Sequence, residues 1–227
     1  MNPHPEEPTN FLYPFIDAQQ DDAKSLLADL AASALAKAAE SRALRRATLE
    51  VNTDLLDRAA TEMARRFASG GRMFTFGNGG SCTDSATLAG LFARPPIAGP
   101  EKSLPAWSLT ADPAIITALG NDVGFERVFA RQLIARAKAG DIAIAISTSG
   151  NSLNLLTALA EARHRGLYTI GFAGYDGGAF VNNPDVDACF VVRSQSVHRI
   201  QESQALLGYQ LWLATRERSS DHGLGAA

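Results

Sequence analysis

Two short loops of this sequence carry many of the groups that can bind an anion. Residues 147–152 read Ser-Thr-Ser-Gly-Asn-Ser, which places four hydroxyls within six residues. Residues 76–81 read Phe-Gly-Asn-Gly-Gly-Ser, and their glycines leave backbone N–H groups uncovered. Hydroxyl and amide donors together can surround a phosphate without a basic residue. We therefore expect a phosphate to bind at these loops.

Each loop also has a simpler interpretation. The serines of 147–152 could only cap the helix that follows at 151–165, and the glycines of 76–81 could form a tight turn without a ligand. The glycine loop does not match the dinucleotide-binding fingerprint, because the third glycine is absent and no acidic residue closes the next strand. The hydroxyl-rich loop is the stronger indication of a phosphate site.

Both loops follow short apolar runs and precede helical patterns. Residues 141–146 are typical of a buried strand, and 72–76 form a similar run. After the first loop, Ser81 to Asp84 fits a capping box at a helix start. Strands that alternate with helices predict a parallel sheet covered on both faces, with ligands beyond the carboxyl ends of its strands. The other expected elements are strands at 104–109, 168–173 and 188–192 and helices at 113–119, 125–137 and 197–216.

The chain before the first strand has a different pattern. Ala/Leu stripes predict two helices at 17–46 and 53–68. One small domain could not bury both apolar faces, so we expect a homotetramer. The expected organisation is an irregular segment at 1–16, a helical oligomerisation segment at 17–70, an α/β domain at 71–217 and a disordered tail at 218–227.

Composition and charge exclude several classes of protein. The formal net charge of the 227 residues is −3 and no basic cluster is visible, so we expect no direct binding of nucleic acid. No stretch of about 18 apolar residues occurs, which argues against a membrane span, and the polar start argues against a signal peptide. Cys82 and Cys189 lie far apart in the sequence and are expected to be thiols in a reducing cytoplasm.

The two loops, taken together with further motifs between residues 68 and 212, resemble a known family. The chain is similar to the sugar isomerase (SIS) domain and, within it, to phosphoheptose isomerase, a branch that also includes the DnaA initiator-associating protein. The motifs that carry this resemblance lie at 77–81, 120–122, 124–125, 129–132, 140–141, 146–152, 174–178 and 199–202.

The resemblance implies a fold and a set of binding residues. The implied fold is α/β, a three-layer, doubly wound, parallel five-stranded sheet of the flavodoxin-like SIS type, with N-terminal oligomerisation helices. The implied phosphate-binding residues are Ser81, Ser147, Thr148, Ser149 and Ser152. The implied sugar-binding residues are Asn78, Gly79, Gly80, Asn121, Asp122 and Gln201.

The family's catalytic and metal positions are mostly replaced. Aldose–ketose isomerisation moves a proton between adjacent carbons and needs a base and a polarised carbonyl. Where the family carries a histidine and a glutamate after the glycine loop, this chain has Thr87 and Leu91, and the family's last histidine is Tyr209. A histidine usual after the Arg-Ile-Gln-Glu motif is Gln204. Of the four zinc ligands that the resemblance implies, only Gln201 remains, so we expect no metal and no other cofactor.

Three other residues are candidates for a displaced catalytic group. Asp84 shares a helix face with the replaced positions, although the capping box gives it a structural role instead. Glu202 follows the retained glutamine, and His198 lies close to it in sequence, where a surface or subunit contact is the simpler role. None of the three occupies the family's base position.

Two functions follow, and the sequence favours the first. It is a non-catalytic sugar-phosphate sensor or adaptor on the isomerase fold, with an unidentified protein partner, because Leu91 cannot move a proton. The alternative is an active isomerase for sedoheptulose 7-phosphate or a related sugar phosphate that uses rearranged residues. In a weaker variant of the alternative, an unusual substrate is isomerised with Tyr209 or His198 as the acid.

Overall fold

The computed structural model describes residues 23–96 and 103–221. The chain separates into two compact units at Arg42, namely Met1–Arg42 and Ala43–Ala227. The expected irregular segment 1–16 lies outside the described residues. The second unit contains the sheet and both loops singled out above.

The N-terminal helical segment is one continuous helix, α1 (Ala23–Ala68), where the sequence predicted two. The expected break near 47–52 does not occur because this stretch contains neither Gly nor Pro. Thr48 and Asn52 are buried, and the Asn52 side chain donates to the Thr48 carbonyl 2.7 Å away, one turn back along the helix. The residues between the two predicted helices are therefore accommodated inside one helix.

The sheet has five parallel strands in the order β2-β1-β3-β4-β5. This strand order is that of flavodoxin-like doubly wound sheets, so the predicted fold class is confirmed. The strands are β1 (Met73–Gly77), β2 (Ala106–Ser108), β3 (Ile142–Ile146), β4 (Tyr168–Gly174) and β5 (Ala188–Val192).

Five α-helices follow the first strand within the residues that the structure describes. They are α2 (Gly80–Ala93), α3 (Pro113–Asp122), α4 (Val128–Arg136), α5 (Leu153–His164) and α6 (Val197–Asp221). The helix predicted at 125–137 is divided into a 3₁₀ turn, Phe125–Arg127, and α4. The last helix continues to Asp221, past the boundary that the sequence suggested at 217.

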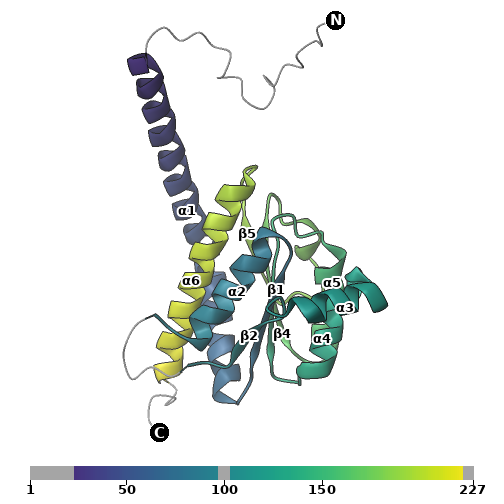
Figure 1. The fold of residues 1–227 in the computed structure, drawn as a ribbon. Helices are drawn as coiled ribbons and strands as arrows, with labels where there is room; N and C mark the ends of the chain where they lie inside the picture. Colours follow the sequence, from purple (N-terminus) through teal and green to yellow (C-terminus); the bar gives the residue numbers. More distant parts are fainter. Residues whose placement is uncertain (1–22, 97–102, 222–227) are drawn as a thin grey trace, which may run out of the picture. The chain divides into compact units, whose positions relative to one another are not determined.

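Alternating residues of each strand face two separate cores. In β3, Ile142, Ile144 and Ile146 pack with buried residues of α2 and α6, whereas Ala143 and Ala145 pack with those of α4 and α5. Successive strand residues point to opposite faces, so the Ile-Ala-Ile-Ala-Ile sequence supplies one large and one small face. Figure 1 shows α2 and α6 on one side of the sheet and α3, α4 and α5 on the other.

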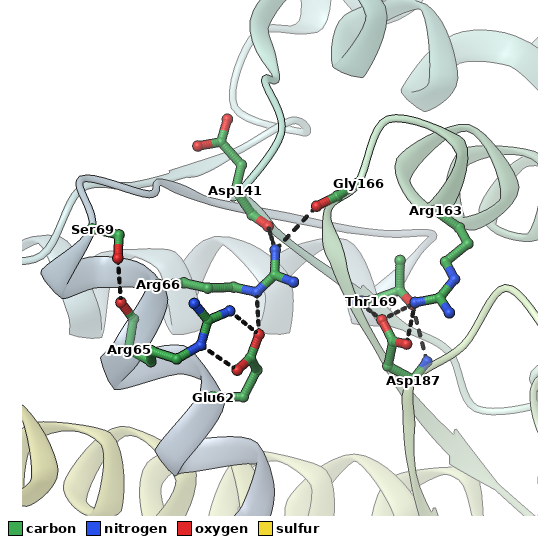
Figure 2. A network of polar contacts seen from close by, with 9 residues as sticks. All are labelled: Glu62, Arg65, Arg66, Ser69, Asp141, Arg163, Gly166, Thr169 and Asp187. Carbon is green, nitrogen blue, oxygen red and sulfur yellow. Dashed lines mark hydrogen bonds and ion pairs between the residues drawn. The ribbon is translucent and has the colours of Figure 1, made fainter.

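Polar contacts hold the amino-terminal edge of the sheet. Arg66 donates to the carbonyls of Asp141 and Gly166, each 3.1 Å away, and also binds Glu62 (Figure 2). The guanidinium groups of Arg65 and Arg66 lower the pKa of Glu62 to about 2. This edge lies at the opposite end of the strands from the two candidate binding loops, so its charges serve the fold.

Within the described ranges, none of the helices is long and apolar enough to cross a lipid bilayer.

Candidate functional site

The two candidate loops leave the sheet side by side. Gly77 ends β1 directly beside Ile146, which ends β3, and the loops begin at the next residues. Because the strands are parallel, both loops emerge at the carboxyl edge, where ligands bind in this class of sheet. The geometry therefore brings 78–81 and 147–152 together, as the sequence predicted.

The start of α2 is set by glycine rather than by a capping box. Gly79 has φ of 55° and ψ of −127°, a backbone conformation that side chains disfavour, and α2 begins at Gly80. The N-terminal cap makes no side-chain hydrogen bond, so the predicted capping box between Ser81 and Asp84 is wrong. Ser81 instead lies buried in the first turn, and the carboxyl of Asp84 is left for another role.

The hydroxyls of loop 147–152 are oriented by backbone groups of the same loop. Ser147 Oγ accepts from Gly150 N at 3.0 Å, and Ser149 Oγ accepts from Asn151 N at 3.3 Å. A hydroxyl that accepts from the backbone keeps its own proton to donate outward. A phosphate is a charged acceptor that takes such donors strongly. The carbonyl of Thr148 accepts from Gly174 N at 2.9 Å, which anchors the loop to the end of β4.

Ser152 does not act as the helix cap that the alternative interpretation requires. It precedes α5 with extended backbone, yet its side chain makes no capping hydrogen bond. Its hydroxyl is thus left beside the N-terminus of α5, where the helix dipole favours an anion. This arrangement fits a phosphate-binding role better than a purely structural one.

Asn78 contacts a residue that the sequence did not single out. Asn78 Nδ2 donates to Asn154 Oδ1 at 2.8 Å, and Asn154 Nδ2 donates back to Asn78 Oδ1 at 3.0 Å. Asn154 is 4% exposed in the first turn of α5. The sequence signal that could have identified Asn154 is an amide residue on the same face of the predicted helix as its apolar residues. The pair ties the glycine loop to the helix that follows the serine loop.

Gln201 joins α6 to the start of α2. Its Nε2 lies 3.4 Å from Asp84 Oδ2, to which it donates. A Cβ on Gly80 would lie 2.3 Å from the same nitrogen, so only glycine leaves room for this amide. The structure therefore brings Gly80, Gln201 and Asp84 together, although the sequence grouped only the first two.

A small cavity of about 60 Å³ lies between α2 and α6, next to the end of β3. Its lining includes Asp84, Thr87, Leu91, Ile146, Gln204 and Tyr209. Four of these, Thr87, Leu91, Gln204 and Tyr209, occupy the replaced family positions, so the replacements face one common space. The cavity combines apolar walls with one carboxyl, an amide and two hydroxyls.

Of the three candidate catalytic groups, Asp84 alone lines this cavity. Burial raises the pKa of the Asp84 carboxyl above its usual value, and the hydrogen bond from Gln201 partly offsets that rise. Glu202 is exposed and binds Arg45 at 2.7 Å. His198 is exposed as well. The capping-box argument that set Asp84 aside is removed, and the two alternatives lie on the surface.

Asn121 and Asp122 are not brought to the loops by any contact in the described ranges. They end α3, both are exposed, and Asn121 Nδ2 donates to Asp122 Oδ1 at 2.8 Å. Their proposed contact with a sugar therefore rests on the family resemblance alone.

Comparisons with known proteins agree with this geometry. The SIS domain model matches residues 38–174. A phosphoheptose isomerase from Solidesulfovibrio magneticus is 42% identical over 178 residues, which is 76% of this chain and 82% of the relative. The solved phosphoheptose isomerase of Neisseria gonorrhoeae has a TM-score of 0.75 and 31% identity, and the match covers 83% of this chain and 99% of that one. A second, from Francisella tularensis, has a TM-score of 0.76 and 30% identity, covering 82% and 97%.

The chain belongs to the phosphoheptose isomerase family of SIS-domain proteins.

These relatives correct the expectation of a non-catalytic sensor or adaptor. A second relative, from Roseiflexus, is 40% identical over 159 residues, 70% of this chain and 79% of the relative, and is also a phosphoheptose isomerase. The expectation was wrong because it rested on the replaced base position alone, whereas the chain is about 40% identical to phosphoheptose isomerases over most of its length. The structure places a different carboxyl, that of Asp84, in the cavity that the replaced position lines.

The residues present do not fit the zinc that the family resemblance implies. Zinc prefers histidine nitrogen, thiolate and carboxylate ligands in a tetrahedral set. Leu91 offers no ligand atom, while Thr87, Gln201 and Tyr209 offer an alcohol, an amide and a phenol. Among residues 23–96 and 103–221, no group of three His, Cys, Asp or Glu side chains could hold a metal ion. The cavity has one carboxyl and apolar walls instead.

Proposed function

We propose that this protein is an aldose–ketose isomerase that acts on sedoheptulose 7-phosphate. The observation that carries the proposal is its identity of about 40% with phosphoheptose isomerases over most of both chains. The hydroxyl-rich loop beside the N-termini of α2 and α5 supports it, because that arrangement suits the phosphate end of the substrate.

The phosphate loops would position the sugar for chemistry at the cavity. Ser147, Ser149 and Ser152 donate hydroxyl protons to the phosphate, together with Ser81 and Thr148. The sugar chain then extends past the glycine loop towards the space between α2 and α6. Fixing the phosphate in this way converts proton transfer into a positioned, unimolecular step.

Asp84 is the proposed base. Its carboxylate takes the proton from the carbon next to the carbonyl, which forms an enediol, and returns the proton to the neighbouring carbon. Between these steps the carbonyl oxygen gains a proton and the adjacent hydroxyl loses one, so the ketose becomes the aldose without a net change in atoms. Burial raises the pKa of Asp84 towards the range in which a carboxyl transfers protons well.

Donors beside Asp84 can stabilise the oxygen that becomes negative in this reaction. Tyr209 lines the same cavity, and its phenolic hydroxyl can donate a hydrogen bond. The Gln201 amide donates to Asp84 and is a second donor close by. Preorganised donors of this kind stabilise a developing oxyanion. The polarising role that a metal ion supplies elsewhere would then fall to neutral groups.

The test is a coupled isomerase assay on the purified full chain with sedoheptulose 7-phosphate. We expect turnover of about 1 s⁻¹ or faster, within the usual enzyme range. Absence of turnover, with calorimetry still showing binding of the sugar phosphate, would contradict the isomerase function and leave only the binding site.

The proposal also includes the state of association and the cellular location of the protein. We propose a homotetramer, supported by exposed leucines on α1 such as Leu27 and Leu35, which are 64% and 72% exposed in the single chain. The cytoplasmic location also remains a prediction from the sequence.

A further inference from the structure

Gln204 occupies an unusual position between the phosphate loop and the cavity. It belongs to α6, is 3% exposed and lines the cavity together with Asp84 and Tyr209. Its Nε2 donates to the backbone carbonyl of Ser147 at 2.7 Å. One side chain therefore contacts both the loop that would hold phosphate and the space that would hold the sugar.

The chemistry of this contact fixes which way the amide faces. A backbone carbonyl only accepts hydrogen bonds, so the Gln204 nitrogen and not its oxygen must face Ser147. The amide oxygen, Oε1, is then the side-chain atom that Ser147 leaves without a partner. It is buried and has no hydrogen-bond partner among the described residues. Buried polar atoms without partners are rare in folded proteins and call for an explanation.

Because Gln204 lines the cavity, a hydrogen-bond donor that enters the cavity can supply the partner that Oε1 lacks. Oε1 can only accept, so it disfavours an anionic acceptor such as phosphate and suits a neutral hydroxyl. The cavity of about 60 Å³ has room for a water molecule or a hydroxyl-bearing carbon but not for a whole sugar phosphate. The geometry thus separates the phosphate-binding loop from a neighbouring position that takes a hydroxyl donor.

We propose that Gln204 is a specificity residue whose Oε1 accepts a hydrogen bond from one hydroxyl of the bound sugar while its Nε2 holds Ser147. The proposal rests on the proposed function in that it takes a phosphorylated sugar as the ligand of the two loops. It adds that the site recognises a hydroxyl on the sugar, so a substrate that lacks this hydroxyl leaves Oε1 unpaired and is rejected.

The experiment compares two ligands by calorimetry. Inorganic phosphate reports on the serine loop alone, whereas sedoheptulose 7-phosphate reports on the loop and the cavity. Methionine has a side chain of similar length, so Gln204→Met removes the amide donor Nε2 and the amide acceptor Oε1 with little change in size. We expect its affinity for the sugar phosphate to fall about three- to tenfold more than its affinity for phosphate, the effect of one hydrogen bond. Equal losses for the two ligands, or no loss, would mean that Gln204 only braces Ser147, and would overturn the proposal.

Gln204→His is the conservative rescue. A neutral imidazole also has one donor and one acceptor nitrogen. It can therefore donate to the Ser147 carbonyl and still accept from the sugar. We expect this variant to recover at least part of the preference for sedoheptulose 7-phosphate over inorganic phosphate that Gln204→Met loses. A histidine variant that discriminates no better than the methionine variant would count against the acceptor role.

Gln132→Met is the matched control for loss of a buried amide. Gln132 is 4% exposed on α4, and its Nε2 donates to the Leu109 carbonyl at 2.9 Å, away from the cavity. We expect it to lower thermal stability and to leave the ratio of the two dissociation constants unchanged. A change of that ratio as large as in Gln204→Met would overturn the assignment of the hydroxyl contact to Gln204.

A measurement on the unaltered protein tests the inference without any variant. Sugar phosphates that each lack one hydroxyl are compared with the complete sugar. We expect at least one to bind about threefold or more weakly. If all bind as well as the complete sugar, the inference fails. Failure of the isomerase assay alone would count against the proposed function but would leave these binding ratios to decide the role of Gln204.

Discussion

At the scale of single residues, the decisive feature is that α2 carries a carboxyl, that of Asp84, two turns before the position at which the family's carboxyl is replaced by Leu91. Leu91 removes the family's base, yet Asp84 lines the same cavity and hydrogen-bonds Gln201. Residues three and seven positions apart on a helix share a face, so α2 can present either position to one space. A lost residue type at one site is therefore weak evidence that the chemistry is lost.

Asp84→Asn should separate catalysis from stability. The general base is worth about 10²–10⁴ in rate, so we expect the isomerase rate to fall by at least 10²-fold. Because burial raises the pKa of Asp84, its ionised form destabilises the folded chain at pH values above the unfolded pKa. The asparagine variant should thus unfold at a higher temperature at neutral pH, and the gain should vanish in acid.

The pH profile of the unaltered enzyme checks the same assignment. A base must be ionised, so kcat/KM should fall as the pH drops through the raised pKa of Asp84. The midpoint of that fall should lie above about 3.9, the ordinary aspartate value. A full isomerase rate in Asp84→Asn would contradict this role. A lower melting temperature of that variant would contradict it as well, because that is the result expected if Asp84 capped the start of α2.

The serine loop is expected to provide much of the affinity for the phosphate group. Replacing Ser149 and Ser152 together by Ala removes two hydroxyl donors to phosphate, each worth roughly 1.5–3 kcal/mol with a charged acceptor. We expect affinity for sedoheptulose 7-phosphate to fall by about tenfold or more in each single variant and by about 10²-fold or more in the double variant. The unphosphorylated sugar, which makes no such bonds, should bind weakly to both forms. Calorimetry that shows unchanged affinity in the double variant would place the phosphate elsewhere.

The replaced ligand set predicts that activity does not depend on zinc. A leucine, an alcohol, an amide and a phenol do not form a zinc site. We expect elemental analysis of the purified protein to show less than stoichiometric zinc and a chelator to leave the isomerase rate unchanged. Loss of activity with chelator, restored by added zinc, would show that other residues complete a metal site.

At the scale of elements, the close approach of α2 and α6 builds the site. Gly80 begins α2, and Gln201 on α6 fills the space in which a side chain at Gly80 would lie. Ser147 at the end of β3 is held by Gln204, one turn further along α6. The start of α2 and the first turns of α6 must therefore keep a fixed spacing for Asp84 and the serine loop to face the same ligand.

Gly80→Ala tests that spacing. The added Cβ would lie 2.3 Å from Gln201 Nε2, and the end of a flexible side chain can move away at little cost to stability. Gln201 would then lose its hydrogen bond to Asp84. Because that hydrogen bond lowers the pKa of the Asp84 carboxyl, its loss should raise the pKa. We expect a reduced isomerase rate and an acid limb of kcat/KM shifted to higher pH.

Gly90→Ala is the control in the same helix. A Cβ at Gly90 has no heavy atom within 4 Å, so the change should only favour the helix, by about 0.5–1 kcal/mol. Its pH profile should match that of the unaltered protein. An identical profile in Gly80→Ala would show that the Gln201 contact does not tune Asp84.

At the scale of the whole molecule, the single chain leaves apolar surface uncovered. Leu27, Leu30 and Leu35 of α1 are 64%, 57% and 72% exposed. Exposed leucines in this number on one helix are typical of an interface between protein chains. The uncovered leucines therefore predict that several copies of the chain associate.

We expect sedimentation at micromolar concentration to show a tetramer. Leu30→Lys combined with Leu35→Lys should shift the chain to smaller species, because two charges would have to be buried at the interface. Ser33→Lys, on the same helix at an exposed polar position, should leave the assembly largely intact. A stable monomer of the unaltered chain would contradict the prediction.

Sequence patterns were enough to predict the five strands, the helices that follow the first strand, the positions of the two loops and the family. Apolar runs such as 141–146 are continuous because strands of a parallel sheet are buried on both faces, which makes them easy to recognise. The serine and glycine loops are local in sequence, and their composition was enough to place them at strand ends. The continuity of α1 was missed because the prediction followed the two Ala/Leu stripes, and residues 47–52 lie between them; tertiary packing buries Thr48 and Asn52 in this stretch.

The side chains that share the cavity could not be predicted from the sequence. Asp84, Gln204 and Tyr209 lie on two helices far apart in sequence, and nothing in their local patterns sets the distance between them. The predicted capping box at Ser81 failed because the turn at Gly79 starts the helix one residue earlier, a backbone preference that competes with side-chain capping. Contacts between distant elements depend on how those elements pack, and packing is fixed by the whole core rather than by any one segment.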